Sequence, residues 1–311
     1  MARAVCLDDD GRSCENQVGR SASSWGGREE EKLLYAGCDL GVATAKVAVI
    51  DEEGLLAFEI LAYSGFPQEA AAAATERALA RVGVPRSRLK RYLSTGFGGK
   101  AVPHSDGAVP DTACLHRAVR MLDPRVRTVV SVGGHSFSVF HIRDDGGLGE
   151  SAITDMCTAG MGLMLETVAV ALDLPLDGWD PGVQRPGQVP FIDNQCPIFA
   201  ESEAISLVNE GHDRHDVQAG VTAAVANKIA GLTRRLGVRR EVAIVGGVAK
   251  NRAVVGLLER NLQLGFAGLS GMDPQVVAAY GAALLAQEGC SLDTERLSSS
   301  VSEHLRRKGG S

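Results

Sequence analysis

The chain has 311 residues, 45% of them hydrophobic and 23% charged, with a formal net charge of −6. This length allows two domains with their own cores, the charge provides no basic surface for nucleic acid, and no apolar run approaches the ~20 residues that span a bilayer. Seven cysteines are scattered without the spacing of a secreted disulfide framework, which favours a reducing cytoplasm.

The first part of the chain alternates strands with a helix after a polar leader. Residues 1–32 lack the apolar centre of a signal peptide, so they indicate a disordered leader or a start codon assigned too early. We then expect strands at LLYAGCDLG, AKVAVID and LLAFEILAY with a turn at EEG (52–54), a helix over 67–82 and a strand near 91–95. This order predicts an α/β domain.

A second set of elements follows in a similar order. It comprises a helix near 110–122, strands RTVVSVG and SFSVFHI, a turn at DDGG (144–147), helices near 158–172, 197–210 and 216–236, strand EVAIVGG, a helix near 250–260, a short strand and a helix near 274–287. Residues 289–311 are polar and indicate a disordered tail.

The two sets contain an internal repeat. Residues 39–54, DLGVATAKVAVIDEEG, align without a gap on residues 131–146, SVGGHSFSVFHIRDDG, so that Gly41 falls on Gly133, which Gly134 follows. Two hairpins that turn on glycine can face each other across a cleft and hold the phosphates of a nucleotide with backbone N–H groups. The simpler alternative is two ordinary hairpins with glycine turns.

Polar side chains of the first copy predict the chemistry of this cleft. Asp39 can hold a magnesium ion, directly or through water, Lys46 supplies a positive charge, and Thr44 supplies a hydroxyl. Asp39 and Lys46 are therefore the catalytic candidates. In the second copy the acid position is occupied by Ser131.

A third glycine element favours a nucleotide site over ordinary hairpins. In IVGGVAKN, residues 244–251, a buried strand breaks at Gly246 and Gly247 and leads through Asn251 into a helix. Bare backbone at such a break lets a flat adenosine lie against it, so we assign Gly246, Gly247 and Asn251 to cofactor binding.

The chain resembles the activator ATPases of 2-hydroxyacyl-CoA dehydratases and the related ATPase subunits of benzoyl-CoA reductases over about residues 34–288. The resemblance rests on GCDLGVATAK, STGFGGK, SVGG, DMCTAGMGLMLE, CPIFAESEAIS and GGVAKN in the family's order. It implies binding of ATP and Mg²⁺ by a two-lobed α/β fold of the actin-like, sugar-kinase-like type. We expect a first lobe at 33–108 plus 270–288 and a second lobe at 109–269.

Two cysteines carry the most specific part of the resemblance. Relatives bind one four-iron four-sulfur cluster at the interface of a homodimer through two cysteines per subunit, and Cys157 and Cys196 match them. Both cysteines precede predicted helices, whose N-terminal N–H groups and dipoles stabilise thiolates. Two-fold symmetry would supply the four ligands of a cubane. The alternative is two buried cysteines that act as small hydrophobic residues.

Other candidates are weaker. Glu201 and Glu203 follow Cys196 on its helix and either couple the cluster to the nucleotide or form a solvated face. Cys38 lies in a buried strand and is expected in the core. Six histidines show no metal-ligand spacing and are expected at the surface or in loops: His104, His116, His135, His141, His212 and His215.

The second phosphate hairpin departs from the family pattern. Relatives usually carry DIGGQD followed two residues later by a lysine, whereas this chain has SVGGHS over 131–136 and Ser138 in place of the lysine. In the first hairpin, Val42 and Ala43 replace frequent hydroxyls. Loss of a positioning group in such sites typically lowers the rate ~10²-fold or more. We therefore expect an ATPase with a degenerate second phosphate motif, in which nucleotide binding is better supported than hydrolysis.

Three functions remain open at this point. The first is an ATP-driven electron donor to an acyl-CoA dehydratase or reductase component, itself reduced by ferredoxin or flavodoxin. The second is a nucleotide-responsive iron–sulfur partner protein without efficient turnover. The third is a small-molecule kinase of the same fold, which the cluster cysteines and Ser131 disfavour.

Overall fold

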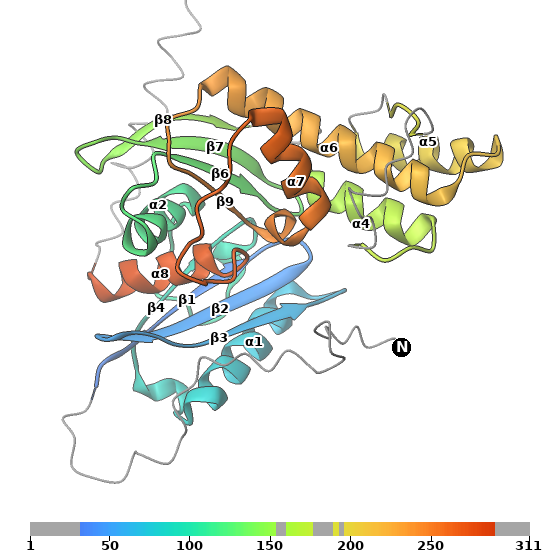
Figure 1. The fold of residues 1–311 in the computed structure, drawn as a ribbon. Helices are drawn as coiled ribbons and strands as arrows, with labels where there is room; N and C mark the ends of the chain where they lie inside the picture. The colour runs from blue at the N-terminus through green and yellow to red at the C-terminus, as the bar shows by residue number, and fades with distance from the viewer. Residues whose placement is uncertain (1–31, 154–159, 177–188, 193–195, 290–311) are drawn as a thin grey trace, which may run out of the picture.

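The computed structural model describes residues 32–153, 160–176, 189–192 and 196–289. Within them the chain forms two β-sheets, and helices α2 (Asp111–Leu122) and α8 (Val277–Gln287) lie between the two (Figure 1). The other long helices cover the outer faces. No helix in the described ranges has the length and apolar character to cross a bilayer.

The first sheet has the strand order β3-β2-β1-β4-β5. Strands β1, β2 and β3 form an antiparallel meander, and β4 and then β5 continue the sheet in parallel pairing. The strands are β1 (Leu34–Leu40), β2 (Thr44–Asp51), β3 (Gly54–Ala62), β4 (Leu89–Thr95) and β5 (Gly107–Ala108). Helix α1 (Pro67–Val82) covers the face of this sheet that points away from the second sheet (Figure 1).

The second sheet repeats this plan with the order β8-β7-β6-β9. Strands β6, β7 and β8 form the antiparallel meander, and β9 pairs with β6 in parallel. The strands are β6 (Thr128–Val132), β7 (Phe137–Ile142), β8 (Leu148–Ile153) and β9 (Val242–Val245). On the outer side of this sheet, α6 (Arg214–Leu236) packs on β7 and β8, and α7 (Arg252–Leu262) packs on α6. Helices α4 (Met161–Ala171) and α5 (Pro197–Asn209) pack on each other and on α6.

The repeat expected from the sequence is present in backbone detail. In the first hairpin the Gly41 N–H donates to the Thr44 carbonyl at 3.0 Å, and in the second the Gly133 N–H donates to the Ser136 carbonyl at 2.8 Å. These four residues occupy matching positions of the alignment. The glycine turn is thus the same structure in both copies, and the predicted duplication is confirmed.

Close packing holds α8 between the sheets. A side chain at Gly37 of β1 would collide with the α8 carbonyl of Ala279, and one at Gly281 would collide with the α2 carbonyl of Cys114. Both glycines allow backbones to approach, and side chains from both sheets join α2 and α8 in one buried cluster that includes Tyr35 and Phe140. The base of the cleft is therefore a packed core.

Most elements lie where the sequence predicts them, with three differences. Helix α1 matches its prediction, whereas β8 and the two-residue β5 were not expected. The predicted short strand between α7 and α8 is wrong, because residues 263–276 contain no strand, although the Ala267 N–H donates to the Val242 carbonyl of β9. His141 is also not at the surface: it is buried in β7, and its ring contacts the Gly237 carbonyl.

Candidate functional site

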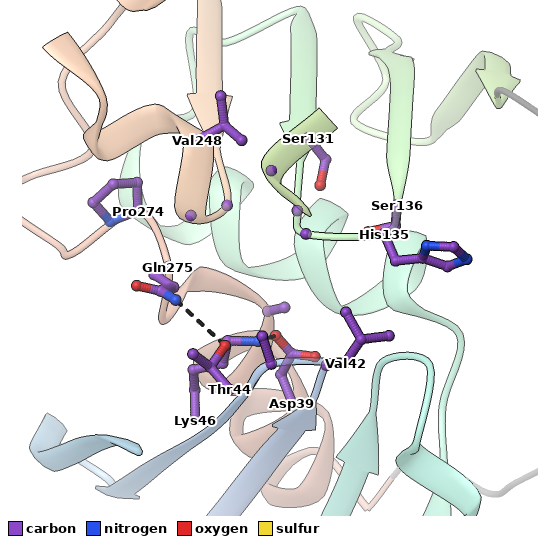
Figure 2. A pocket seen from close by; sticks show the side chains of 18 of the residues that line it. Asp39, Val42, Thr44, Lys46, Ser131, His135, Ser136, Val248, Pro274 and Gln275 are labelled. Carbon is purple, nitrogen blue, oxygen red and sulfur yellow. Dashed lines mark hydrogen bonds and ion pairs between the residues drawn. The ribbon is translucent and has the colours of Figure 1, made fainter. Parts of the chain in front are cut away.

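A cavity of about 910 Å³ lies between the two glycine hairpins. The first hairpin forms one wall, and the second hairpin faces it from the other sheet (Figure 2). The break after β9 closes one end. All nine residues predicted for phosphate, magnesium and adenosine binding line this cavity: Asp39, Gly41, Thr44, Lys46, Gly133, Gly134, Gly246, Gly247 and Asn251.

Asp39 and Lys46 form an ion pair at the cavity wall. They face each other across β1 and β2, and Lys46 Nζ lies 2.8 Å from Asp39 Oδ2, with side chains only 9% and 14% exposed for the lysine and the aspartate. A charged pair in this position combines a carboxylate for a cation with an ammonium for a phosphate.

Two glycines make room for this pair. A Cβ on Gly41 would lie 2.9 Å from Lys46 Nζ, and a Cβ on Gly96, whose φ is +86°, would collide with Asp39 Oδ1. Gly96 comes from the loop after β4, so both adjoining loops are shaped around the two charges.

The turns present free backbone donors to the cavity. Within the described residues the N–H groups of Val42, Gly134 and His135 have no acceptor. The carbonyls of the second turn are instead hydrogen-bonded to α4. The Gly133 carbonyl accepts from the Gly162 N–H at 3.2 Å, and the Gly134 carbonyl accepts from the Leu163 N–H at 3.0 Å. Clustered N–H groups with their carbonyls turned away form an anion-binding concavity.

The two hairpins also meet at the cavity mouth. The ring of Phe97, from the loop after β4, contacts the ring of His135 edge-on with centroids 5.7 Å apart. A Cβ on Gly134 would lie 3.4 Å from Val42. The cleft is thus narrow on this side in the structure.

The glycines of the third element have different tasks. Gly246 has φ +96°, and a Cβ there would collide with the Val132 carbonyl, so this glycine is required by the fold. A Cβ on Gly247 would meet only Gln275, at 3.6 Å, and would otherwise point into open space. Gly247 is therefore the position where bare backbone is available to a planar ligand.

Asn251 builds the wall of the cavity. Its Oδ1 accepts from the Val254 N–H at 3.0 Å, capping α7, and its Nδ2 donates to the Leu176 carbonyl at 3.1 Å. Both ends of the amide are thus engaged, and the residue ties the segment after α4 to the start of α7.

Asp111 is an acid in the cavity that the sequence analysis did not identify. It is the first residue of α2, and its carboxyl lies near Asp39 and Lys46. Burial, followed by the negative charge of Asp39, raises the pKa of Asp111 to about 7, although Lys46 opposes this. The signal in the sequence was only an aspartate after a proline, which is common at helix starts.

Gln275 is a second residue that the sequence did not single out. It precedes α8, and its Nε2 donates to Thr44 Oγ1 at 3.4 Å, as the dashed line in Figure 2 shows. Gln275 thereby links the first hairpin to the glycine break next to Gly247.

Of the two candidate metal-binding cysteines, Cys157 lies outside the described residues. Cys196 is half-buried and is the N-cap of α5, followed by Pro197 at the first helical position as predicted. Burial lowers the pKa of Lys228 on α6, and a negative charge on the nearby Cys196 would oppose this shift. Within the described residues there is no group of three metal-ligating side chains.

The other cysteines with described surroundings are core residues. Burial raises the pKa of the Cys38 thiol to about 12 and that of the Cys114 thiol still further, so both thiols are neutral. Cys38 therefore lies in the core, as predicted. On α5, Glu201 and Glu203 are both half-buried, and neither side chain lines the cavity.

The comparisons with known proteins point to one family. The model of the BadF/BadG/BcrA/BcrD ATPase family matches residues 36–286. The activator of lactoyl-CoA dehydratase from Anaerotignum propionicum is 30% identical over 264 residues, which are 82% of this chain and 98% of the relative. The (R)-2-hydroxyglutaryl-CoA dehydratase activating ATPase from Acidaminococcus fermentans is 29% identical over 232 residues, which are 74% of this chain and 88% of the relative.

A solved structure agrees with these matches. The activator of the 2-hydroxyisocaproyl-CoA dehydratase from Clostridium difficile, determined with bound ADPNP, has a TM-score of 0.75 at 28% identity and covers 83% of this chain and 95% of its own. The fold is accordingly the two-lobed actin-like type with duplicated hairpins that the sequence predicts. Because the family model matches nearly all of the described residues, the chain belongs to the BadF/BadG/BcrA/BcrD ATPase family.

Proposed function

We propose that this protein is an ATP-dependent activator of a 2-hydroxyacyl-CoA dehydratase-like or acyl-CoA reductase-like enzyme. The observation that carries the proposal is the meeting of three glycine segments around one cavity that holds the Asp39–Lys46 ion pair. Relatives that are activators of such dehydratases, one of them solved with an ATP analogue, support the same role.

Different residues of the cavity would bind the magnesium ion, the phosphates and the adenine. Asp39 would hold the magnesium ion, directly or through water, and Lys46 would neutralise the phosphates. The free N–H groups of Val42, Gly134 and His135 would cradle the phosphate oxygens. The adenine would lie against Gly247, where a side chain is missing and space is open.

Asp111 is suited to accept a proton from the attacking water. Its carboxyl faces the same cavity as Asp39, and a pKa raised to about 7 makes it a stronger base than an ordinary aspartate. Asp111 would therefore supply the carboxylate that is missing at position 131, where this chain has Ser131. We propose hydrolysis with Asp39 and Lys46 on the phosphates and Asp111 on the water.

We further propose a four-iron four-sulfur cluster shared across a homodimer. Cys196 fits such a role, because it is half-buried at the start of α5, where helix N–H groups stabilise a thiolate, and α4 and α5 extend together from the second sheet (Figure 1). Cys157 of each subunit would complete the four ligands. When bound, the cluster supplies a low-potential electron for the acyl-CoA enzyme, with ferredoxin or flavodoxin as its source in the cytoplasm.

Metal analysis after anaerobic purification tests the cluster. We expect about four iron and four sulfide per dimer in the wild-type protein, and loss of both, with a weakened dimer, in Cys196→Ser and Cys157→Ser. Cys114→Ala is the matched control, because it changes a cysteine buried in α2 and should keep the iron. Full iron content and an intact dimer in both serine variants would refute the shared site.

The second candidate is an iron–sulfur partner that binds ATP without efficient turnover. The hydroxyls of Ser131 and Ser138 at the positions of the first hairpin's ion pair favour it. Steady-state ATP hydrolysis by the iron-loaded dimer separates the two functions. Sustained turnover supports the ATPase, whereas binding without turnover supports the alternative.

A further inference from the structure

Helix α4 carries one charged side chain into the cavity that none of the roles above uses. Gly162, Leu165 and Glu166 line the cavity, and they share one helix face because they are three and four residues apart. Within the described residues the carboxylate of Glu166 has no hydrogen bond or ion pair, and it is exposed to the cavity. An unpaired carboxylate at a cavity wall is available to a ligand.

The position of Glu166 along α4 is fixed at two points. At its start the helix is tied to the second hairpin, because the Gly162 N–H donates to the Gly133 carbonyl and a Cβ on Gly162 would lie 2.8 Å from it. Glu166 follows one turn later, about 6 Å along the axis. The helix also lies beside the 3-10 turn Gly247–Lys250 of the adenosine break. Glu166 therefore lies between the phosphate turn and the adenosine break.

Within the described residues, no basic side chain forms an ion pair with Glu166. Lys250, on the neighbouring turn, is held by Asp273 at 2.8 Å. Burial raises the pKa of Glu166, and no charged side chain contributes to the shift. Leu165, Leu176 and Val248 supply the apolar part of this end of the cavity.

In a nucleotide, the sugar connects the base to the phosphates. A ribose presents two adjacent hydroxyl donors, and an ionised carboxylate has two acceptor oxygens and no donor, which makes them complementary. We propose that Glu166 is a specificity-determining residue that accepts hydrogen bonds from the 2′- and 3′-hydroxyls of the bound nucleotide and so selects ribonucleotides over 2′-deoxyribonucleotides. This inference rests on the proposed nucleotide-binding function.

Calorimetric titration of the whole protein with ATP, 2′-deoxy-ATP and ITP in the presence of Mg²⁺ tests the inference. Wild-type protein should bind ATP ~10- to 100-fold more tightly than 2′-deoxy-ATP, the range expected for a hydrogen bond to a charged acceptor. In Glu166→Ala the ratio should fall close to one, chiefly because ATP binds more weakly, and Glu166→Gln should give an intermediate ratio.

The control is Glu76→Ala, which removes an exposed glutamate of α1 outside the cavity and should keep the wild-type ratio. Equal affinity of the wild type for ATP and 2′-deoxy-ATP, or a ratio that survives in Glu166→Ala, overturns the ribose assignment and leaves the proposed function intact. A change confined to ITP would show that Glu166 contacts the base, which also overturns it. Failure of the wild type to bind any of the three nucleotides overturns the proposed function as well.

Discussion

In the first hairpin Asp39 and Lys46 face each other across β1 and β2 as a buried ion pair, whereas in the second Ser131 and Ser138 face each other across β6 and β7 as two hydroxyls. The glycine turn is nevertheless the same in both. The turn therefore depends on glycine and strand register and not on the charges. A repeat can lose its charged groups and still cradle an anion with its backbone.

The cavity also contains a carboxylate that comes from neither hairpin. The second hairpin has no carboxylate at the cavity, but α2 begins beside the first hairpin with Asp111. Two carboxylates in one cleft repel each other unless a cation lies between them. The asymmetry thus brings the carboxylates of Asp39 and Asp111 together beside the first hairpin, where we propose magnesium binds.

The largest effect is expected from breaking the charged pair. Asp39→Ala removes the proposed magnesium ligand and leaves Lys46 buried without its partner, so nucleotide affinity should fall at least ~10²-fold and the free energy of unfolding by about 3 kcal/mol. Titration with Mg-ATP and thermal unfolding measure the two. Ser131→Ala, the equivalent change in the second hairpin, should alter both by less than about 1 kcal/mol. Similar losses in the two variants would contradict the asymmetry.

A smaller loss is expected when the acid of α2 is neutralised. Asp111→Asn keeps the shape of the side chain but removes the proposed base, so single-turnover hydrolysis should slow ~10²-fold while ATP still binds. Rapid mixing at saturating Mg-ATP provides the rate, and titration provides the affinity. Unchanged hydrolysis with intact binding would assign the water to another residue.

Some residues of the cavity could be predicted from the sequence, and others could not. Gly41 and Gly133 were predictable because a repeat places the same turn twice, and Gly246 and Gly247 because a strand breaks there. Gly246 is required by the fold because the Val132 carbonyl lies beside it, whereas Gly247 faces open space. A local sequence pattern cannot predict this difference, because it depends on the tertiary neighbours of each glycine. Asp111 and Gln275 reach the cavity only through the packing of α2 and α8 between the sheets. The edge strand β8 escaped prediction because its residues are largely exposed and lack an alternating pattern.

The raised pKa of Asp111 predicts a moderate dependence of stability on pH in protein free of metal and nucleotide. The folded carboxyl keeps its proton up to about pH 7, whereas the unfolded one releases it near 3.8. The folded state thus binds more protons in between, and the free energy of unfolding falls as pH rises across this window. Chemical unfolding in EDTA at several pH values should show this fall in the wild type and a flatter profile in Asp111→Asn. Parallel profiles would refute the perturbed carboxyl.

The smallest effect is expected from converting the second hairpin into the first. Ser131→Asp restores a carboxylate that points into the cleft and should raise single-turnover hydrolysis only a few-fold, because Asp111 already supplies an acid. Alone, the new carboxylate has no cross-strand partner and should lower stability. Adding Ser138→Lys places an ammonium opposite it, as in the Asp39–Lys46 pair, and should recover about 0.2–1 kcal/mol. A wild-type rate equal to or above that of Ser131→Asp, with ATP binding intact in both, would contradict the expected gain, and a gain of about tenfold or more would mean that Asp111 does not supply the acid.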